Sequence, residues 1–82
     1  MPYIPNKLRP RLEISDQQMP NDAGELNYCI TRILYRSWLK QPRYITLCML
    51  MGTLICVAFE FYRIVASSYE DQKRNDNGDV FK

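Results

Sequence analysis

The side chains best suited to bind a ligand lie in one stretch, where cationic and aromatic residues alternate. The stretch contains Tyr28, Arg32, Tyr35, Arg36, Trp38, Lys40 and Arg43. Guanidinium groups bind phosphate through paired hydrogen bonds, and aromatic rings stack on bases. The pattern therefore predicts a site for a small anionic, nucleotide-like molecule. Its expected ligand-binding residues are Tyr28, Arg32, Tyr35, Arg36 and Arg63. The alternative is a solvated basic face without a ligand.

Residues typical of an enzyme are scarce in this sequence. There is no histidine, so general acid–base chemistry would fall to carboxylates, cysteines or lysines. Glu70 and Asp71 are adjacent, so on a helix their side chains point about 100° apart and do not face each other. Gly24, Gly52 and Gly78 are isolated, unlike the glycines of a phosphate-binding loop. We expect no catalysis and no cofactor.

The cysteines and the net charge of the chain limit which binding partners and which cellular compartment we expect. Cys29, Cys48 and Cys56 are an odd number, lie in apolar stretches and lack metal-ligand spacing. We expect them to be buried free thiols, with no metal site. Eleven Lys and Arg against nine Asp and Glu give a net charge of +2, too small for a long nucleic-acid footprint. The N-terminus lacks an apolar signal segment, so we expect a cytoplasmic protein, in the host cell if a phage encodes it.

Proline, glycine and capping signals place these residues on an arm, two helices and a tail. Four prolines predict an extended arm over 1–21, with one possible turn at residues 6–9. Asp22 and Glu25 form a capping-box signal for a helix over 22–41, which Pro42 ends. Residues 44–74 contain no proline, and their apolar side chains recur every three or four residues. The tail, residues 75–82, contains Gly78 as a left-handed stop.

The expected fold is all-α, a single domain formed by a helical hairpin of two antiparallel helices with this arm and tail. A chain of 82 residues buries only about 60% of the surface that it exposes when unfolded. Without disulfides or a metal, self-association is the remaining way to cover apolar surface. We therefore predict a homo-oligomer. The residues expected to support the oligomer or to dock the tail are Tyr62, Tyr69, Val80 and Phe81.

A membrane-spanning helix is the alternative for the second apolar segment. Residues 44–59 carry no charge, and Arg36, Lys40 and Arg43 precede them as a basic flank. As a helix these 16 residues would span about 24 Å, against a hydrocarbon core of about 30 Å. A more polar stripe runs through Thr46, Thr53 and Glu60. The stripe favours a helix that is buried between subunits, so membrane insertion is not the expected arrangement.

Short motifs at both ends of the chain and in both predicted helices resemble those of a known family. They are PYI at 2–4, GELNY at 24–28, EFYR at 60–63, YEDQK at 69–73 and NGDVF at 77–81. This pattern resembles an uncharacterised family of small phage and bacterial proteins with GELNY, EFYRR, PYEDxK and NGDVY. Ile64 replaces the second arginine of EFYRR, Ser68 the proline, and Phe81 the final tyrosine. The family's second helix is more polar, which implies that other subunits bury the extra apolar surface here.

The expected function is a phage-type accessory protein, with a possible role in anti-defence. It would act by binding as a homo-oligomer and by sequestering a nucleotide-like signalling molecule. The first alternative is a protein–protein interaction module that inhibits a host or phage protein. The second is a single-pass membrane peptide of the holin type. The family resemblance implies no activity, so these functions depend on the residues described above.

Overall fold

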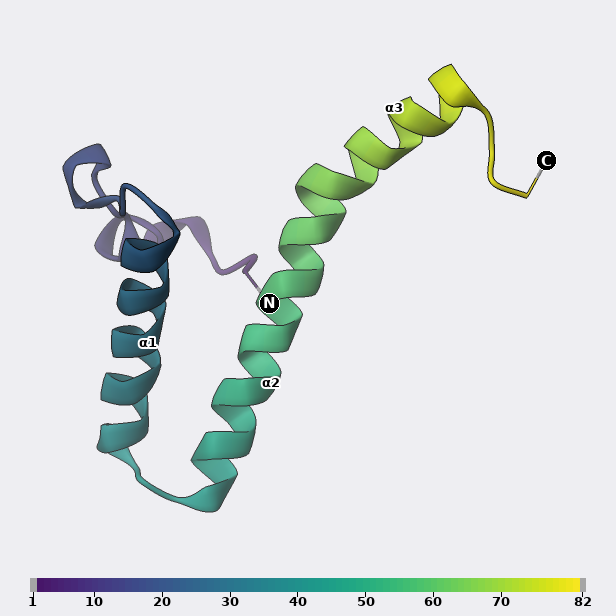
Figure 1. Ribbon diagram of the computed structural model, residues 1–82. Coiled ribbons are helices and arrows are strands. Elements are labelled where there is room, and N and C mark those ends of the chain that lie inside the picture. Colours follow the sequence, from purple (N-terminus) through teal and green to yellow (C-terminus); the bar gives the residue numbers. More distant parts are fainter. Residues whose placement is uncertain (1, 82) are drawn as a thin grey trace. The chain divides into compact units, whose positions relative to one another are not determined.

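The computed structural model describes residues 2–81, which form helices and turns without a β-strand. Met1 and Lys82, the ends of the predicted arm and tail, lie outside the described residues. The chain divides into two units, Met1–Met51 and Gly52–Lys82, with the division inside the second long helix. The elements, shown in Figure 1, are η1 Asn6–Leu8, η2 Pro10–Leu12, η3 Asp16–Gln18, α1 Ala23–Lys40, α2 Tyr44–Phe61, η4 Tyr62–Ala66 and α3 Ser67–Asn77. The all-α prediction is confirmed, while the antiparallel pairing of two helices stays a prediction.

We predicted an extended arm, and this prediction is wrong. The arm folds into three short 3₁₀ helices, η1 to η3. Proline fixes φ near −65°, a value that a 3₁₀ turn shares with extended backbone, so prolines exclude only a long helix here. Pro10 occupies the first position of η2, where its missing N–H costs no hydrogen bond. The Ser15 backbone N–H donates to the Gln18 side-chain oxygen at 3.0 Å and fixes the start of η3.

The helix α1 begins at the predicted cap. The Asp22 carboxylate accepts a hydrogen bond from the Glu25 backbone N–H at 2.8 Å. The Glu25 carboxylate reaches back one residue further than predicted and accepts from the Asn21 N–H at 2.8 Å. At the other end, the Gln41 N–H donates to the Trp38 carbonyl at 3.1 Å, and Pro42 follows. Both ends of α1 therefore have backbone hydrogen bonds that local sequence signals could predict.

Replacing Asp22 by alanine is expected to lower the free energy of unfolding by about 1 kcal/mol, because the Glu25 backbone N–H then loses its side-chain acceptor. The Asn variant keeps an acceptor oxygen at the same place and should lose only a few tenths of a kcal/mol. Thermal unfolding followed by circular dichroism measures both. Equal melting temperatures for the Ala and Asn variants would show that this cap contributes nothing.

A continuous helical segment of 34 residues, Tyr44–Asn77, is formed by α2, η4 and α3. Its middle, η4, is a π-helical turn in which the Ser67 N–H donates to the Tyr62 carbonyl five residues earlier. The segment ends at Asn77, three residues later than predicted. As expected, Gly78 is the stop: its φ of +92° and ψ of 157° lie in a region that essentially only glycine adopts.

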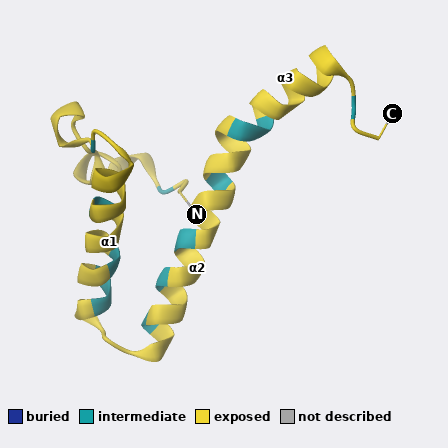
Figure 2. Ribbon diagram, in the orientation of Figure 1, coloured by how far each residue is buried: buried dark blue, intermediate teal, exposed yellow. Residues whose placement is uncertain are grey.

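No residue among those described is buried, as Figure 2 shows by the absence of dark blue. In α2 this leaves large apolar side chains in solvent on several faces, with Phe59 72% and Phe61 67% exposed. Cys48 and Cys56, which we predicted to be buried, are exposed because the described chain does not cover their faces of α2. The tight core of an independent domain is therefore missing from a single copy of residues 2–81.

The long helical segment meets the length and composition required to cross a membrane. Its most apolar window of 18 residues has a mean hydropathy of 1.9, and none of that window is buried. A soluble core helix of the same composition would be mostly buried within its own chain. Exposed apolar surface of this extent is typical of a site of protein or membrane interaction.

Candidate functional site

The face of α1 that carries Tyr28, Arg32 and Arg36 contains most of the residues predicted to bind a ligand. These residues are four apart, so each lies one turn beyond the last and about 40° around the helix. One terminal guanidinium nitrogen of Arg32 donates to the Tyr28 hydroxyl at 3.3 Å. The central carbon of the same guanidinium lies 5.8 Å from the centre of the Tyr28 ring. This contact holds the Arg32 side chain against the face of the Tyr28 ring. The remaining N–H groups of the guanidinium can donate hydrogen bonds to an anion.

A stacked pair of aromatic rings borders this face. The rings of Tyr35 and Trp38 stack with centroids 6.2 Å apart and an angle of 25° between their planes. Tyr35 is exposed and Trp38 half-buried, so one ring presents a free flat surface while the other supports it. Tyr35 is seven residues from Tyr28 and therefore lies on the same side of α1. The structure thus brings together four of the five predicted ligand-binding residues on one helix.

The two arginines of this face lack a neutralising partner. Within the described part of Met1–Met51, no carboxylate forms an ion pair with Arg32 or Arg36. Two positive charges one turn apart repel each other, which costs a few tenths of a kcal/mol in an exposed helix. A bound phosphate would relieve that repulsion and accept hydrogen bonds from both guanidinium groups. The electrostatics of the face therefore favour an anion.

The fifth predicted residue, Arg63, lies in η4 of the other unit and already has an acidic partner. Its Nε and one terminal nitrogen donate to the same Glu60 carboxylate oxygen, at 3.1 and 2.6 Å. The side chain of Glu60 is only 24% exposed, so the pair is partly shielded from water. The positive charge of Arg63 is therefore neutralised by Glu60 within the same helical segment, as a spacing of three residues predicts.

A hollow beside Tyr28 was not predicted from the sequence. It has a volume of about 460 Å³ and lies between the end of the arm and the first turns of α1. Its lining residues are Gln17, Gln18, Met19, Pro20, Asn21, Gly24, Glu25, Tyr28 and Cys29. Amide side chains such as Gln17 and Asn21 both donate and accept hydrogen bonds, as recognition of a base edge requires. A cluster of amides before Pro20 is the only sequence signal for it, and amides are common in ordinary loops.

The residues predicted to dock the tail are exposed within their own unit. Tyr62 opens η4, and Tyr69 lies under the Lys73 ammonium, 5.6 Å from nitrogen to ring centre. Val80 and Phe81 are 90% and 95% exposed. The tail is therefore undocked within Gly52–Lys82, and its docking stays a prediction. Among residues 2–81 there is also no cluster of three or more potential metal ligands.

Comparison with known proteins gives one match. A family model described as a domain of unknown function, DUF6899, matches residues 1–80. No curated protein and no solved structure matches the chain.

Proposed function

The chain belongs to the DUF6899 family, a domain of unknown function, and we propose that this member is a homo-oligomeric binding protein for a small, phosphate-bearing nucleotide. The ligand's phosphate would lie against Arg32 and Arg36. Its base would stack on Tyr28 or Tyr35, at the mouth of the hollow beside Tyr28. The observation that carries the proposal is the Arg32–Tyr28 contact next to an arginine without an ion pair.

Self-association is supported by the uncovered apolar surface of α2. Ile45, Ile55 and Phe59 lie on one face of the helix and are all exposed, which a stable soluble chain avoids over so large an area. If a second copy packed on this face, these apolar side chains would be removed from water. Repetition of the α1 faces around an oligomer would also place several guanidinium groups near one ligand, as phosphate recognition often requires.

The resemblance of the motifs to phage proteins supports a biological role as an accessory protein. Without a catalytic constellation, such a protein would act on a signalling nucleotide by keeping it bound. We therefore propose sequestration, and an anti-defence role if the nucleotide is a signal of the host. A protein partner bound at the same basic face is the alternative within this proposal.

The test is a thermal-shift screen of cyclic and linear nucleotides with the full chain. A ligand at a hundred times its Kd stabilises the folded protein by about 2.7 kcal/mol and raises the melting temperature accordingly. In the Arg36→Ala variant this gain should largely disappear, while the ligand-free protein stays as stable or becomes slightly more so. Arg74→Ala is the matched control, since Arg74 is exposed in α3 and pairs with Asp71 at 3.6 Å. A flat response of the wild type to every nucleotide would leave protein binding as the function.

A second candidate function, a single-pass membrane protein, is favoured by the composition of α2 itself. Its 18 residues would span about 27 Å as a helix, close to the hydrocarbon thickness of about 30 Å. Arg36, Lys40 and Arg43 would then lie on the cytoplasmic side. The Glu60–Arg63 pair would lie near the opposite interface, where pairing lowers the cost of both charges.

A further inference from the structure

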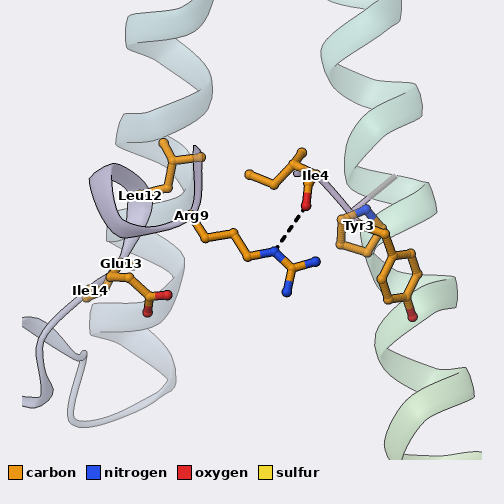
Figure 3. A pocket seen from close by; sticks show the side chains of 7 residues that line it. Tyr3, Ile4, Arg9, Leu12, Glu13 and Ile14 are labelled. Carbon is orange, nitrogen blue, oxygen red and sulfur yellow. Dashed lines mark hydrogen bonds between the residues drawn. The ribbon is translucent and has the colours of Figure 1, made fainter. Parts of the chain in front are cut away.

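The folded arm surrounds a shallow hollow that the proposed function does not use. It has a volume of about 410 Å³, within the range of about 300–1,000 Å³ of ligand pockets. Its lining residues are Pro2, Tyr3, Ile4, Arg9, Leu12, Glu13 and Ile14. Figure 3 shows the Arg9 side chain crossing the hollow, with its Nε donating to the Ile4 carbonyl at 3.1 Å. The terminal nitrogens of that guanidinium point away from this bond, so the hollow combines apolar walls with a fixed cation.

The C-terminal tail presents an apolar group that matches such a hollow. Gly78 turns the chain out of α3, and the Asp79 carboxylate then accepts a hydrogen bond from the Phe81 N–H at 3.1 Å. This local bond fixes a turn and leaves Val80 and Phe81 as the two most exposed large apolar residues described. An aromatic side chain on a preformed turn loses little entropy on binding, which makes it a good interface anchor.

The charges of the two segments are complementary. The side chains of the arm, residues 1–21, carry three cations, Lys7, Arg9 and Arg11, against Glu13 and Asp16, a net charge of +1. The side chains of the tail, residues 75–82, carry Asp76 and Asp79 against Lys82, a net charge of −1. No ion pair joins Arg9 to Glu13 among the described residues, so the Arg9 charge remains available. Opposite net charges favour the encounter of arm and tail and disfavour pairing of two arms or of two tails.

We propose that the hollow of the arm binds the Val80–Phe81 tail of a second copy of this chain. The Phe81 ring would enter between Tyr3, Leu12 and Ile14. Asp79 would approach the terminal nitrogens of Arg9. The proposal rests on the self-association in the proposed function, since assembly through α2 raises the local concentration of tails around each arm. It adds a contact of a different kind, in which one surface of the chain binds another and copies join head to tail.

The test uses the full chain with Phe81 replaced by the photo-crosslinking analogue p-benzoylphenylalanine. Irradiation is expected to yield a covalent species of twice the chain mass, with the cross-link in residues 2–14. Arg9→Asp and Asp79→Arg should each lower the cross-linking yield about fivefold, which corresponds to about 1 kcal/mol for one exposed ion pair. The double variant should recover most of the yield, because the pair is restored with reversed charges. Arg11→Asp is the control, since Arg11 carries the same charge but does not line the hollow.

Cross-links that fall outside residues 2–14, or only within one chain, would overturn the proposal. An unchanged cross-linking yield for Asp79→Arg would do the same, because this variant leaves the Arg9–Ile4 hydrogen bond and the hollow intact. Light scattering on the same samples separates the two proposals. An oligomer without arm cross-links would refute the docking and leave self-association standing. A monomer would refute both.

Discussion

Replacing Phe59 by glutamate is expected to separate the assembly into single chains at micromolar concentration. Phe59 is 72% exposed in the single chain and lies on the α2 face that includes Ile45 and Ile55. Burial of a phenylalanine contributes about 1.5–3 kcal/mol, and leaving an unpaired carboxylate in its place costs several kcal/mol more. Together these two free energies raise the dissociation constant of the assembly by at least about a thousandfold. Sedimentation or light scattering across a dilution series measures it.

The control for Phe59 is Phe61→Glu, the same substitution two residues later and about 160° around the helix. Phe61 is 67% exposed in the single chain but lies outside the face of Ile45, Ile55 and Phe59. This variant should assemble like the wild type.

If the wild type instead partitions into membranes and only detergent releases it, the single-pass candidate replaces the oligomer. Phe59→Glu would then abolish membrane partition rather than assembly. An unchanged mass for Phe59→Glu in solution would exclude this face as an interface.

Removal of residues 79–82 is expected to lower the stability of the assembly by about 3 kcal/mol. Val80 and Phe81 are nearly fully exposed in the single chain, so docking removes most of their apolar surface from water. For a small protein such a loss lowers the melting temperature by roughly 10 °C or more. Thermal unfolding of wild type and truncated protein at equal chain concentration measures the difference.

The control for the truncation is a tail of the same length built from glycine and serine. It keeps the chain length but supplies neither an aromatic anchor nor a carboxylate to pair with Arg9. The truncated protein and this variant should melt at the same reduced temperature. Wild-type stability in both would show that Val80 and Phe81 are simply solvated.

The features that sequence predicted well are those decided by a few neighbouring residues. Asp22 and Glu25 determine the start of α1 because a short acidic side chain reaches the backbone N–H three residues on. Gly78 ends α3 because its φ of +92° is strained for any residue with a Cβ atom. Each needs only local geometry.

The features that sequence missed depend on longer or less distinctive signals. The helix continues to Asn77 because Gln72 donates to the Asp76 carboxylate at 3.2 Å and supports a polar last turn. Asn75, Asp76 and Asn77 favour turns, so their composition predicted an earlier end. The hollow beside Tyr28 requires the arm to fold back onto the start of α1, which residue types alone do not specify.

The π-helical turn η4 changes the angular phase between the two halves of the long helical segment. A π-helical turn holds one residue more than an α-helical turn, so side chains five residues apart across η4, rather than four, lie above one another. The three- and four-residue spacing that aligns side chains along α2 is therefore displaced by one residue in α3. Deleting a single residue from Tyr62–Ala66 should turn η4 into an ordinary α-helical turn and leave the direction of the α3 side chains unchanged.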